Sequence, residues 1–364
     1  MFISPVFARA KRWYARYERF LIPGALLFGI IADTITFRFI NLSLAFSILF
    51  THLLLSLLAI TFMHAHDTLW AGYEQKTLRF IRLFAPLLLQ FTFGALLSGF
   101  LIFYGFAGSF SVSWPFLLLI IFLMVSNDLL KKYYLLFIVH LSVFFFSLLS
   151  YAILVIPTIL KQMGTSVFLL SSLLSSLFMF AYLFALSSFI PNIRTSRRAL
   201  TVSFLSIISI MNLFYFTNII PPIPLSLREI GVYHSVSRES ESGTYHLLAE
   251  ELSLIDRLRF YPPIHKVGEV IVFTSVFAPA DLKTTIIHHW QYYNASEKTW
   301  ISAGNISFPM TGGRINGYRG YSKKTVLPGL WRVDIENPRG QVMGRIRFHV
   351  KEVQNPLQLR TEWK

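Results

Sequence analysis

Residues 134–157, YLLFIVHLSVFFFSLLSYAILVIP, decide the fold class of this chain. The run contains no Asp, Glu, Lys or Arg, and it exceeds the roughly 20 apolar residues that a helix needs to cross about 30 Å of hydrocarbon. We therefore expect an all-α transmembrane bundle of about seven helices over residues 21–220, each satisfying its own backbone polar groups. The other six apolar runs lie at 21–40, 43–63, 80–104, 109–126, 166–190 and 199–219.

The composition of the whole chain supports a membrane protein. Hydrophobic residues make up 54% and charged residues only 14%, whereas soluble domains are about 25% charged. Cysteine is absent, which excludes disulfides, thiolate metal sites and cysteine nucleophiles. The sequence also predicts no catalytic residue set, no metal site and no bound cofactor.

The distribution of basic residues predicts the orientation in the membrane. The chain has a net charge of +15, and the excess before residue 220 gathers in the leader and alternate loops, at 9–19, 76–82, 131–132 and 194–198. Such loops stay with cytoplasmic headgroups, so a basic amphipathic leader at 1–20 lies on the lipid bilayer and nucleic-acid binding is not expected. We predict a multi-pass protein of the inner (plasma) membrane with a cytoplasmic N-terminus.

An odd number of crossings places the rest of the chain on the periplasmic or extracellular side. The shortest run, 109–126, is the weakest element of that count. Prolines at 221, 222 and 224 predict a Pro-rich linker at 221–229, followed by an exported domain at 230–364.

The exported half alternates apolar and polar residues with the period of β-strands. Residues 270–277, VIVFTSVF, have apolar side chains at both odd and even positions, which predicts a central strand buried on both faces. Asn337–Gly340 predicts a turn. The number and spacing of strands favour an all-β immunoglobulin-like sandwich. The expected strands lie near 232–237, 244–250, 269–277, 284–293, 299–308, 318–325, 330–336 and 341–351.

Four short motifs in this half resemble a known family. They are an H-x-W strand, an R-x-Y/W-S-x-K strand, a P-G-x-W-R-V-[DE] strand and a closing G-x-x-L-G strand, in which Met343 replaces the leucine. Over about residues 255–352 the chain resembles the bacterial domain of unknown function 2914. The resemblance implies this domain after a helical membrane region, and it implies no activity. The motif residues are His288, His289, Trp290, Tyr318–Lys324, Pro328–Asp334, Gly340, Met343, Gly344, Phe348 and Val350.

The same motifs combine cations with flat aromatic rings, which suits binding of glycans or anionic groups. A structural role is the alternative, because Trp290 and Trp331 lie on strands whose core needs large side chains. Arg319 and Arg332 are also able to pair with Asp334 across strands. The candidate ligand-binding residues are His288, Trp290, Arg319, Tyr321, Ser322, Lys324, Trp331 and Arg332.

Polar residues within the membrane half are the second group of candidates, because a charge in hydrocarbon needs a partner or water. Asp33 has three open interpretations: a hydrogen bond between helices, an interfacial position, or a role in transport or catalysis. His64 and His66 point apart on a helix, which disfavours a shared metal. The intramembrane candidates are Asp33, His64, His66, Asp67 and Asp128.

These observations favour a non-enzymatic membrane protein of the bacterial cell envelope. Its β-domain presents a binding or interaction module, and its partners are the lipid bilayer and an envelope glycan or protein. The alternative is a transporter or enzyme that uses the polar residues of the helical bundle, with the β-domain as an accessory.

A pair of C-terminal reporter fusions tests the predicted export. An odd number of crossings gives activity of a reporter that works only outside the cytoplasm, and none from one that works only inside it. Cytoplasmic activity would contradict the count of seven helices.

Overall fold

The computed structural model describes residues 31, 33, 35, 36, 41–69, 76–129, 137–239, 244–266, 268–314, 317–352 and 358–364. The predicted leader at 1–20 and most of the first predicted crossing lie outside these residues. The chain divides into two compact units, each described by itself. The first comprises Met1–Phe103, Leu118–Ala152 and Ser172–Ser209, and the second comprises Tyr104–Leu117, Ile153–Ser171 and Ile210–Lys364.

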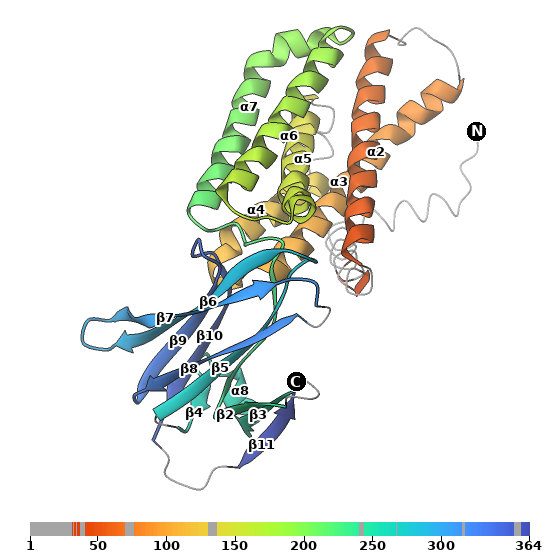
Figure 1. Cartoon of the computed structure of the whole chain (residues 1–364). Coiled ribbons are helices and arrows are strands. Elements are labelled where there is room, and N and C mark those ends of the chain that lie inside the picture. Colours follow the sequence, from red (N-terminus) through yellow and green to blue (C-terminus); the bar gives the residue numbers. More distant parts are fainter. Residues whose placement is uncertain are drawn as a thin grey trace, which may run out of the picture. The chain divides into compact units, whose positions relative to one another are not determined.

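Long helices occupy the predicted membrane half (Figure 1). The structure confirms all six predicted helices that fall in the described residues and shifts their ends. The largest shift is in the last helix, which begins at Pro191 rather than 199, because proline suits the first helical position. The helices are α2 (Leu42–Leu69), α3 (Lys76–Ala107), α4 (Phe110–Leu129), α5 (Phe137–Leu160), α6 (Thr165–Ser187) and α7 (Pro191–Phe216).

Five of these helices contain a stretch that is long and apolar enough to cross a membrane. In α4 the apolar stretch, Phe110–Ser126, is shorter. The five stretches indicate a membrane protein, while the number of crossings and their direction stay predictions. The five are Leu42–Leu69, Phe84–Ala107, Phe137–Leu160, Thr165–Ser187 and Thr195–Phe216.

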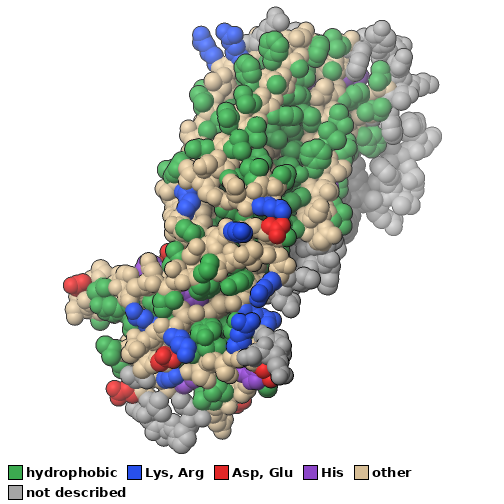
Figure 2. All heavy atoms as spheres, viewed as in Figure 1, with side chains coloured by type: hydrophobic (Ala, Val, Ile, Leu, Met, Phe, Trp, Pro, Cys, Tyr) green, Lys and Arg blue, Asp and Glu red, His purple; other side chains and the backbone are tan. Residues whose placement is uncertain are grey.

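The helices carry large apolar side chains on their outer surface. Phe91, Phe180 and Phe184 are 64%, 72% and 72% exposed, and Figure 2 shows hydrophobic side chains spread over this part of the chain. Exposed apolar surface of this extent is unfavourable in water and suits contact with lipid. Inside the first unit the Leu49 side chain of α2 packs directly on the backbone of Gly99 in α3, because a Cβ added to Gly99 would lie 2.6 Å from Leu49 Cδ2.

Strands form the C-terminal region, in three sheets with the orders β1-β5-β8, β4-β10-β9-β6-β7 and β11-β3-β2. The structure splits the predicted strand at 232–237 into β1 and β2, begins β1 inside the predicted linker, and adds β4, β11 and the short helix α8 (Leu254–Leu258). The strands are β1 (Ser226–Tyr233), β2 (Ser235–Arg238), β3 (Tyr245–Glu250), β4 (Pro263–Ile264), β5 (Gly268–Phe277), β6 (Lys283–Asn294), β7 (Thr299–Thr311), β8 (Tyr318–Val326), β9 (Gly329–Glu336), β10 (Val342–Val350) and β11 (Leu359–Trp363).

Strand β5 is the central strand of its sheet, as the sequence predicts. It pairs antiparallel with β1 on one side and β8 on the other. Val270 and Val272 face a large core shared with the five-stranded sheet. Ile271 and Phe273 face a second, smaller core that includes Leu247 of β3. The apolar run is therefore buried on both faces, each against a different sheet.

Phe273 tests how much the second core contributes to stability. Its ring is fully buried and lies 5.4 Å and 6.2 Å from the rings of Tyr245 and Tyr233. We expect Phe273→Ala to lower the free energy of unfolding by about 3–5 kcal/mol, because truncation removes apolar contacts and leaves a cavity. Urea unfolding followed by tryptophan fluorescence measures the change. The control Leu327→Ala, at a side chain 70% exposed, should change it by less than about 0.5 kcal/mol.

Candidate functional site

A buried polar cluster joins two sheets at the centre of the large core. His288 of β6 lies with Nδ1 2.8 Å from Ser322 Oγ of β8 and with Nε2 3.0 Å from Thr274 Oγ1 of β5. Trp290 Nε1 donates to Ser322 Oγ at 2.9 Å. All four side chains are at most 2% exposed. Hydrogen bonding among these groups offsets the loss of water, which would otherwise make buried polar atoms unfavourable.

Four of the eight candidate ligand residues are therefore in the core. His288, Trp290 and Ser322 belong to the buried cluster, and Trp331 is 6% exposed with Nε1 donating to Leu327 O at 2.9 Å. The structural alternative for Trp290 and Trp331, core packing, is confirmed. Binding by these eight residues stays a prediction, and the four buried ones offer no surface to a ligand.

The remaining four candidates do not gather into one surface. On β8, Lys324 Nζ donates to Ala303 O at 2.5 Å, while Tyr321 is 38% exposed. Arg319 is half-buried on the same strand. Arg332 lies on β9, in the other sheet. Strand alternation places Arg319 and Tyr321 on one face of β8 and Lys324 on the other.

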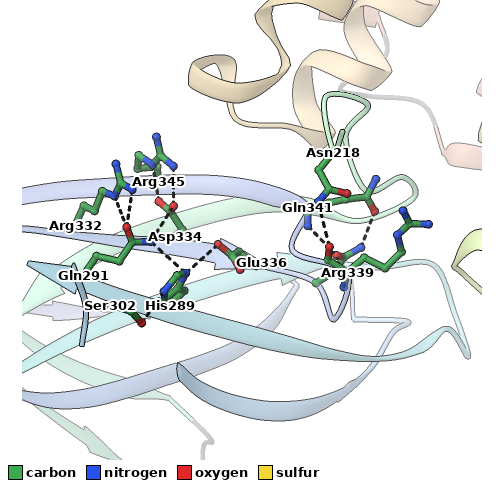
Figure 3. A network of polar contacts seen from close by, with 11 residues as sticks. Asn218, His289, Gln291, Ser302, Arg332, Asp334, Glu336, Arg339, Gln341 and Arg345 are labelled. Atoms are coloured by element: carbon green, nitrogen blue, oxygen red, sulfur yellow. Dashed lines mark hydrogen bonds and ion pairs between the residues drawn. The ribbon is translucent and has the colours of Figure 1, made fainter. Parts of the chain in front are cut away.

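A polar network covers the outer face of the five-stranded sheet (Figure 3). Asp334 of β9 accepts two hydrogen bonds from Arg345 of β10, at 2.5 and 2.6 Å. This finding corrects the expected pairing of Asp334 with Arg319 or Arg332. Arg332 instead donates to Gln291 Oε1 from Nε at 2.8 Å and from Nη2 at 2.5 Å.

The network continues across β6 to β7. Gln291 Nε2 lies 3.1 Å from His289 Nδ1 and 3.5 Å from Asp334 Oδ2. His289 Nε2 lies 3.0 Å from Ser302 Oγ, and its Nδ1 is 3.4 Å from Glu336 Oε1. One strip of hydrogen bonds therefore ties four strands together on the face opposite the core.

Two arginines of this face stack on aromatic rings. The Arg332 guanidinium lies 4.6 Å from the ring centre of Trp300, and the Arg347 guanidinium lies 4.3 Å from that of Phe260. Tyr261 lies nearly parallel to Trp300, with ring centres 6.4 Å apart. We refer to Phe260, Tyr261, Trp300, Arg332 and Arg347 as the aromatic–arginine patch.

The charges of this face are unevenly compensated. The hydrogen bonds that Arg345 donates to Asp334 raise the pKa of Arg345, whereas burial and the nearby Arg345 charge lower the pKa of Arg332. Burial also raises the pKa of Glu336. Within the described part of the chain, Arg332 and Arg347 form no ion pair with a carboxylate, so the patch carries unbalanced positive charge.

Sequence reasoning found Arg332 but missed the other four residues of the patch. The alternation of Arg345, Arg347 and His349 on the last strand was a usable signal, since it places the arginines on the outer face. The segment with Phe260 and Tyr261 carries no strand pattern, so only the folded chain brings it to Trp300.

The β9–β10 turn forms where the sequence predicts it. Asn337 Oδ1 accepts from the backbone N–H groups of Arg339 and Gln341 at 3.0 and 3.1 Å. Within the second unit this turn is held further, because Asn218 Nδ2 donates to Arg339 O at 3.1 Å and Gln341 Nε2 donates to Ile220 O at 3.0 Å (Figure 3). The first bond satisfies a carbonyl of the turn, and the second satisfies a backbone carbonyl just after the end of α7.

In the first unit, the carboxylates of the intramembrane candidates contact polar side chains. Asp33 Oδ2 accepts from Ser98 Oγ at 2.6 Å, the hydrogen-bonded alternative proposed for it. Asp67 accepts two hydrogen bonds from Arg82, both at 2.7 Å. The side chain of Asp128 lies outside the described residues.

The two histidines of the second helix face different neighbours. His64 Nε2 lies 3.5 Å from His140 Nδ1, whereas the ring of His66 lies 5.9 Å from that of Phe62. Among the described residues, no three His, Asp or Glu side chains are grouped in a way that could hold a metal ion.

Protonation of His288 gives a pH test of the buried cluster. Burial lowers its pKa to about 3, below the roughly 6.5 expected in the unfolded chain. Between these values the unfolded chain binds more protons, so stability is full above about pH 6.5 and falls by up to about 1.4 kcal/mol per pH unit below it. We expect His288→Gln to reduce this slope in urea unfolding from pH 7 to pH 4.5. An unchanged slope, or an equal change with the control His246→Gln, would contradict a buried neutral His288.

Comparison with known proteins agrees with the resemblance noted in the sequence. No curated protein matches the chain. The family model described as protein of unknown function DUF2914 matches residues 283–350, within the 255–352 expected from the motifs. The matched segment runs from β6 to β10 and contains His288, Trp290 and Ser322 of the buried cluster. Residues 283–350 in the C-terminal region thus match the DUF2914 family, whose function is unknown.

Proposed function

We propose that this chain is a non-enzymatic protein of the bacterial cell envelope, anchored in the inner membrane, whose β-rich region binds an anionic ligand on the aromatic–arginine patch. In this proposal the N-terminus is cytoplasmic and the exported domain is an immunoglobulin-like sandwich, extended by the small sheet β11-β3-β2. The orientation rests on the positive-inside rule and an odd number of crossings.

One observation carries the proposal: Arg332 is a half-buried cation whose hydrogen-bond partner is a neutral amide. Asp334 attracts Arg332 electrostatically but is hydrogen-bonded to Arg345. Arg332 therefore loses water without gaining an ion pair of its own, which is unfavourable. The lowered pKa of Arg332 reflects burial and the nearby Arg345. A ligand carboxylate or phosphate at this position would supply the missing negative charge through charge-assisted hydrogen bonds.

The surrounding rings support a glycan as the carrier of that charge. Trp300 and Tyr261 offer flat apolar faces, and aromatic rings pack well against the apolar face of a sugar. Ser302, His289 and Gln291 add further hydrogen-bonding groups beside them. We therefore propose an acidic oligosaccharide as the ligand, with Arg332 and Arg347 at its acidic groups.

Transport or catalysis by the helical bundle remains a second proposal. The closeness of the half-buried His64 and the buried His140 favours it, because two neighbouring imidazoles are able to accept and pass a proton. The Asp67–Arg82 pair and the Asp33–Ser98 hydrogen bond favour a structural role. We therefore place binding by the β-rich region first.

Binding of acidic glycans by the full chain in lipid nanodiscs tests the first proposal. We expect uronic-acid oligosaccharides to bind and glucose oligosaccharides of equal length not to bind, with affinity falling as salt rises. Arg332→Gln should weaken binding by about 10- to 100-fold, since a hydrogen bond to a charged group contributes about 1.5–3 kcal/mol.

Arg238→Gln is the matched control for this experiment. Arg238 also stacks on a ring, 5.6 Å from the centre of Tyr245, but it lies on β2, outside the patch. It should leave the affinity unchanged. Equal losses in the two variants, or equal binding of acidic and neutral oligosaccharides, would refute the proposed site.

A further inference from the structure

Arg347 belongs to two features of the β-rich region. Its guanidinium stacks on Phe260 in the aromatic–arginine patch, and the residue also lines a cavity of about 240 Å³. Arg347 also lies close enough to act on Arg332, because burial, the Arg345 charge and the Arg347 charge all lower the pKa of Arg332. The cavity therefore borders the cations at which we place the anionic ligand.

The cavity lies between strands of all three sheets. Strands β1, β3, β4, β10 and β11 each contribute to its wall. Most of the wall is apolar, and its apolar residues include Val232, Ala249, Leu252, Ile264, Ile346 and Phe348. An apolar cavity of roughly 150 Å³ accommodates benzene, so in proportion this cavity accommodates about ten carbon atoms. A hydrocarbon chain of that length would leave water for an apolar surrounding, which is favourable.

The cavity wall also contains charged side chains, most of which have partners within the fold. Glu250 accepts from His234 Nε2 at 2.6 Å, and Glu362 pairs with Arg360. Arg347 stacks on a ring and pairs with no carboxylate among the described residues. Arg347 is therefore the group of this wall that is available to an anion, through charge-assisted hydrogen bonds.

A short apolar segment borders the cavity. Leu252 and Pro262 lie in the cavity wall, and α8 lies between them in the chain. Three apolar side chains of α8 are largely exposed: Leu254 is 77%, Ile255 72% and Leu258 87% exposed. A group of exposed apolar side chains is unfavourable in water and suits contact with an apolar ligand. A chain too long for the cavity would find further apolar surface at α8.

We propose that the ligand of the aromatic–arginine patch is an acidic glycolipid, whose acidic sugar binds at Arg332 and Arg347 and whose acyl chain enters the cavity. This assignment rests on the function proposed above and adds the acyl chain to it. Arg347 joins the two parts of the site, because it belongs both to the patch and to the cavity wall. Burial of the chain adds affinity in proportion to the apolar area that leaves water.

Three soluble probes test this assignment on the full chain in lipid nanodiscs. They are a uronic-acid trisaccharide, its octanoyl ester, and the octanoyl ester of a glucose trisaccharide. After subtraction of partitioning into empty nanodiscs, we expect the acidic ester to bind at least about tenfold more tightly than the bare acidic trisaccharide. The neutral ester should bind at least about tenfold more weakly than the acidic ester, because it lacks the group that pairs with Arg332 and Arg347.

Leu252→Trp fills part of the cavity without altering the aromatic–arginine patch. It should remove the gain from the octanoyl chain and leave the affinity for the bare acidic trisaccharide unchanged. The control Leu327→Trp, at a side chain 70% exposed and outside the cavity wall, should leave both affinities unchanged. The same gain from the chain in Leu252→Trp as in the unaltered protein would contradict the acyl site.

A photoreactive probe keeps the test independent of the folding of that variant. A diazirine at the end of the octanoyl chain of the acidic ester should label the segments 231–233, 249–252 and 346–348 of the unaltered protein, as identified by mass spectrometry. Excess bare acidic trisaccharide should reduce this labelling. Labelling confined to the membrane helices would overturn the acyl site.

The bare acidic trisaccharide separates the acyl site from the function proposed above. If it binds and the octanoyl chain adds no affinity, the acyl site is refuted and the acidic-glycan site stands. If neither acidic probe binds, both are refuted. Arg332→Gln should weaken the bare trisaccharide and its ester by a similar factor, because the two share the same acidic group.

Discussion

Strand β5 must bury both of its faces, and the rest of the β-rich region depends on that constraint. A strand with apolar residues on both faces cannot leave one side in water without exposing a large apolar surface. The five-stranded sheet covers the face with Val270 and Val272, and β3 helps to cover the face with Ile271 and Phe273. The sheet β11-β3-β2 therefore has a physical role. It helps to bury the second face of β5, which two sheets alone would leave exposed.

Polar groups are buried in this region in two different ways. In the large core, His288 is surrounded by hydroxyl and indole partners and stays neutral, because burial lowers its pKa far below its usual range. On the outer face, Asp334 is buried as a charge and is matched by two hydrogen bonds from Arg345. In the large core, hydrogen bonds between neutral groups are sufficient. On the outer face, an ion pair is needed.

This contrast separates structural from binding residues. The His288 cluster is complete within the fold, because its side chains hydrogen-bond to one another inside the core. The aromatic–arginine patch is incomplete, because its cations lack carboxylate partners in the described residues. The function that we propose rests on this incomplete surface.

The sequence alone determined the membrane helices, the change to strands after residue 220 and the central position of β5. These features follow from the length and period of apolar runs, which depend on residues near one another in the chain. The short β4 and β11 carried too little pattern to predict, and the order of the sheets depends on pairings between distant segments.

The candidate site was only partly predictable for the same reason. The motif residues His288, Trp290 and Ser322 are polar or aromatic. In the sequence, such residues look the same whether they form a binding site or a buried cluster. Only the tertiary structure decided between them, because burial depends on what the other sheet places opposite. It also brought Phe260 and Tyr261 to the arginines of β9 and β10. The sequence by itself determined which segments are apolar and how they alternate. Which polar residues reach the surface together was decided by the fold, since that depends on contacts between residues far apart in the chain.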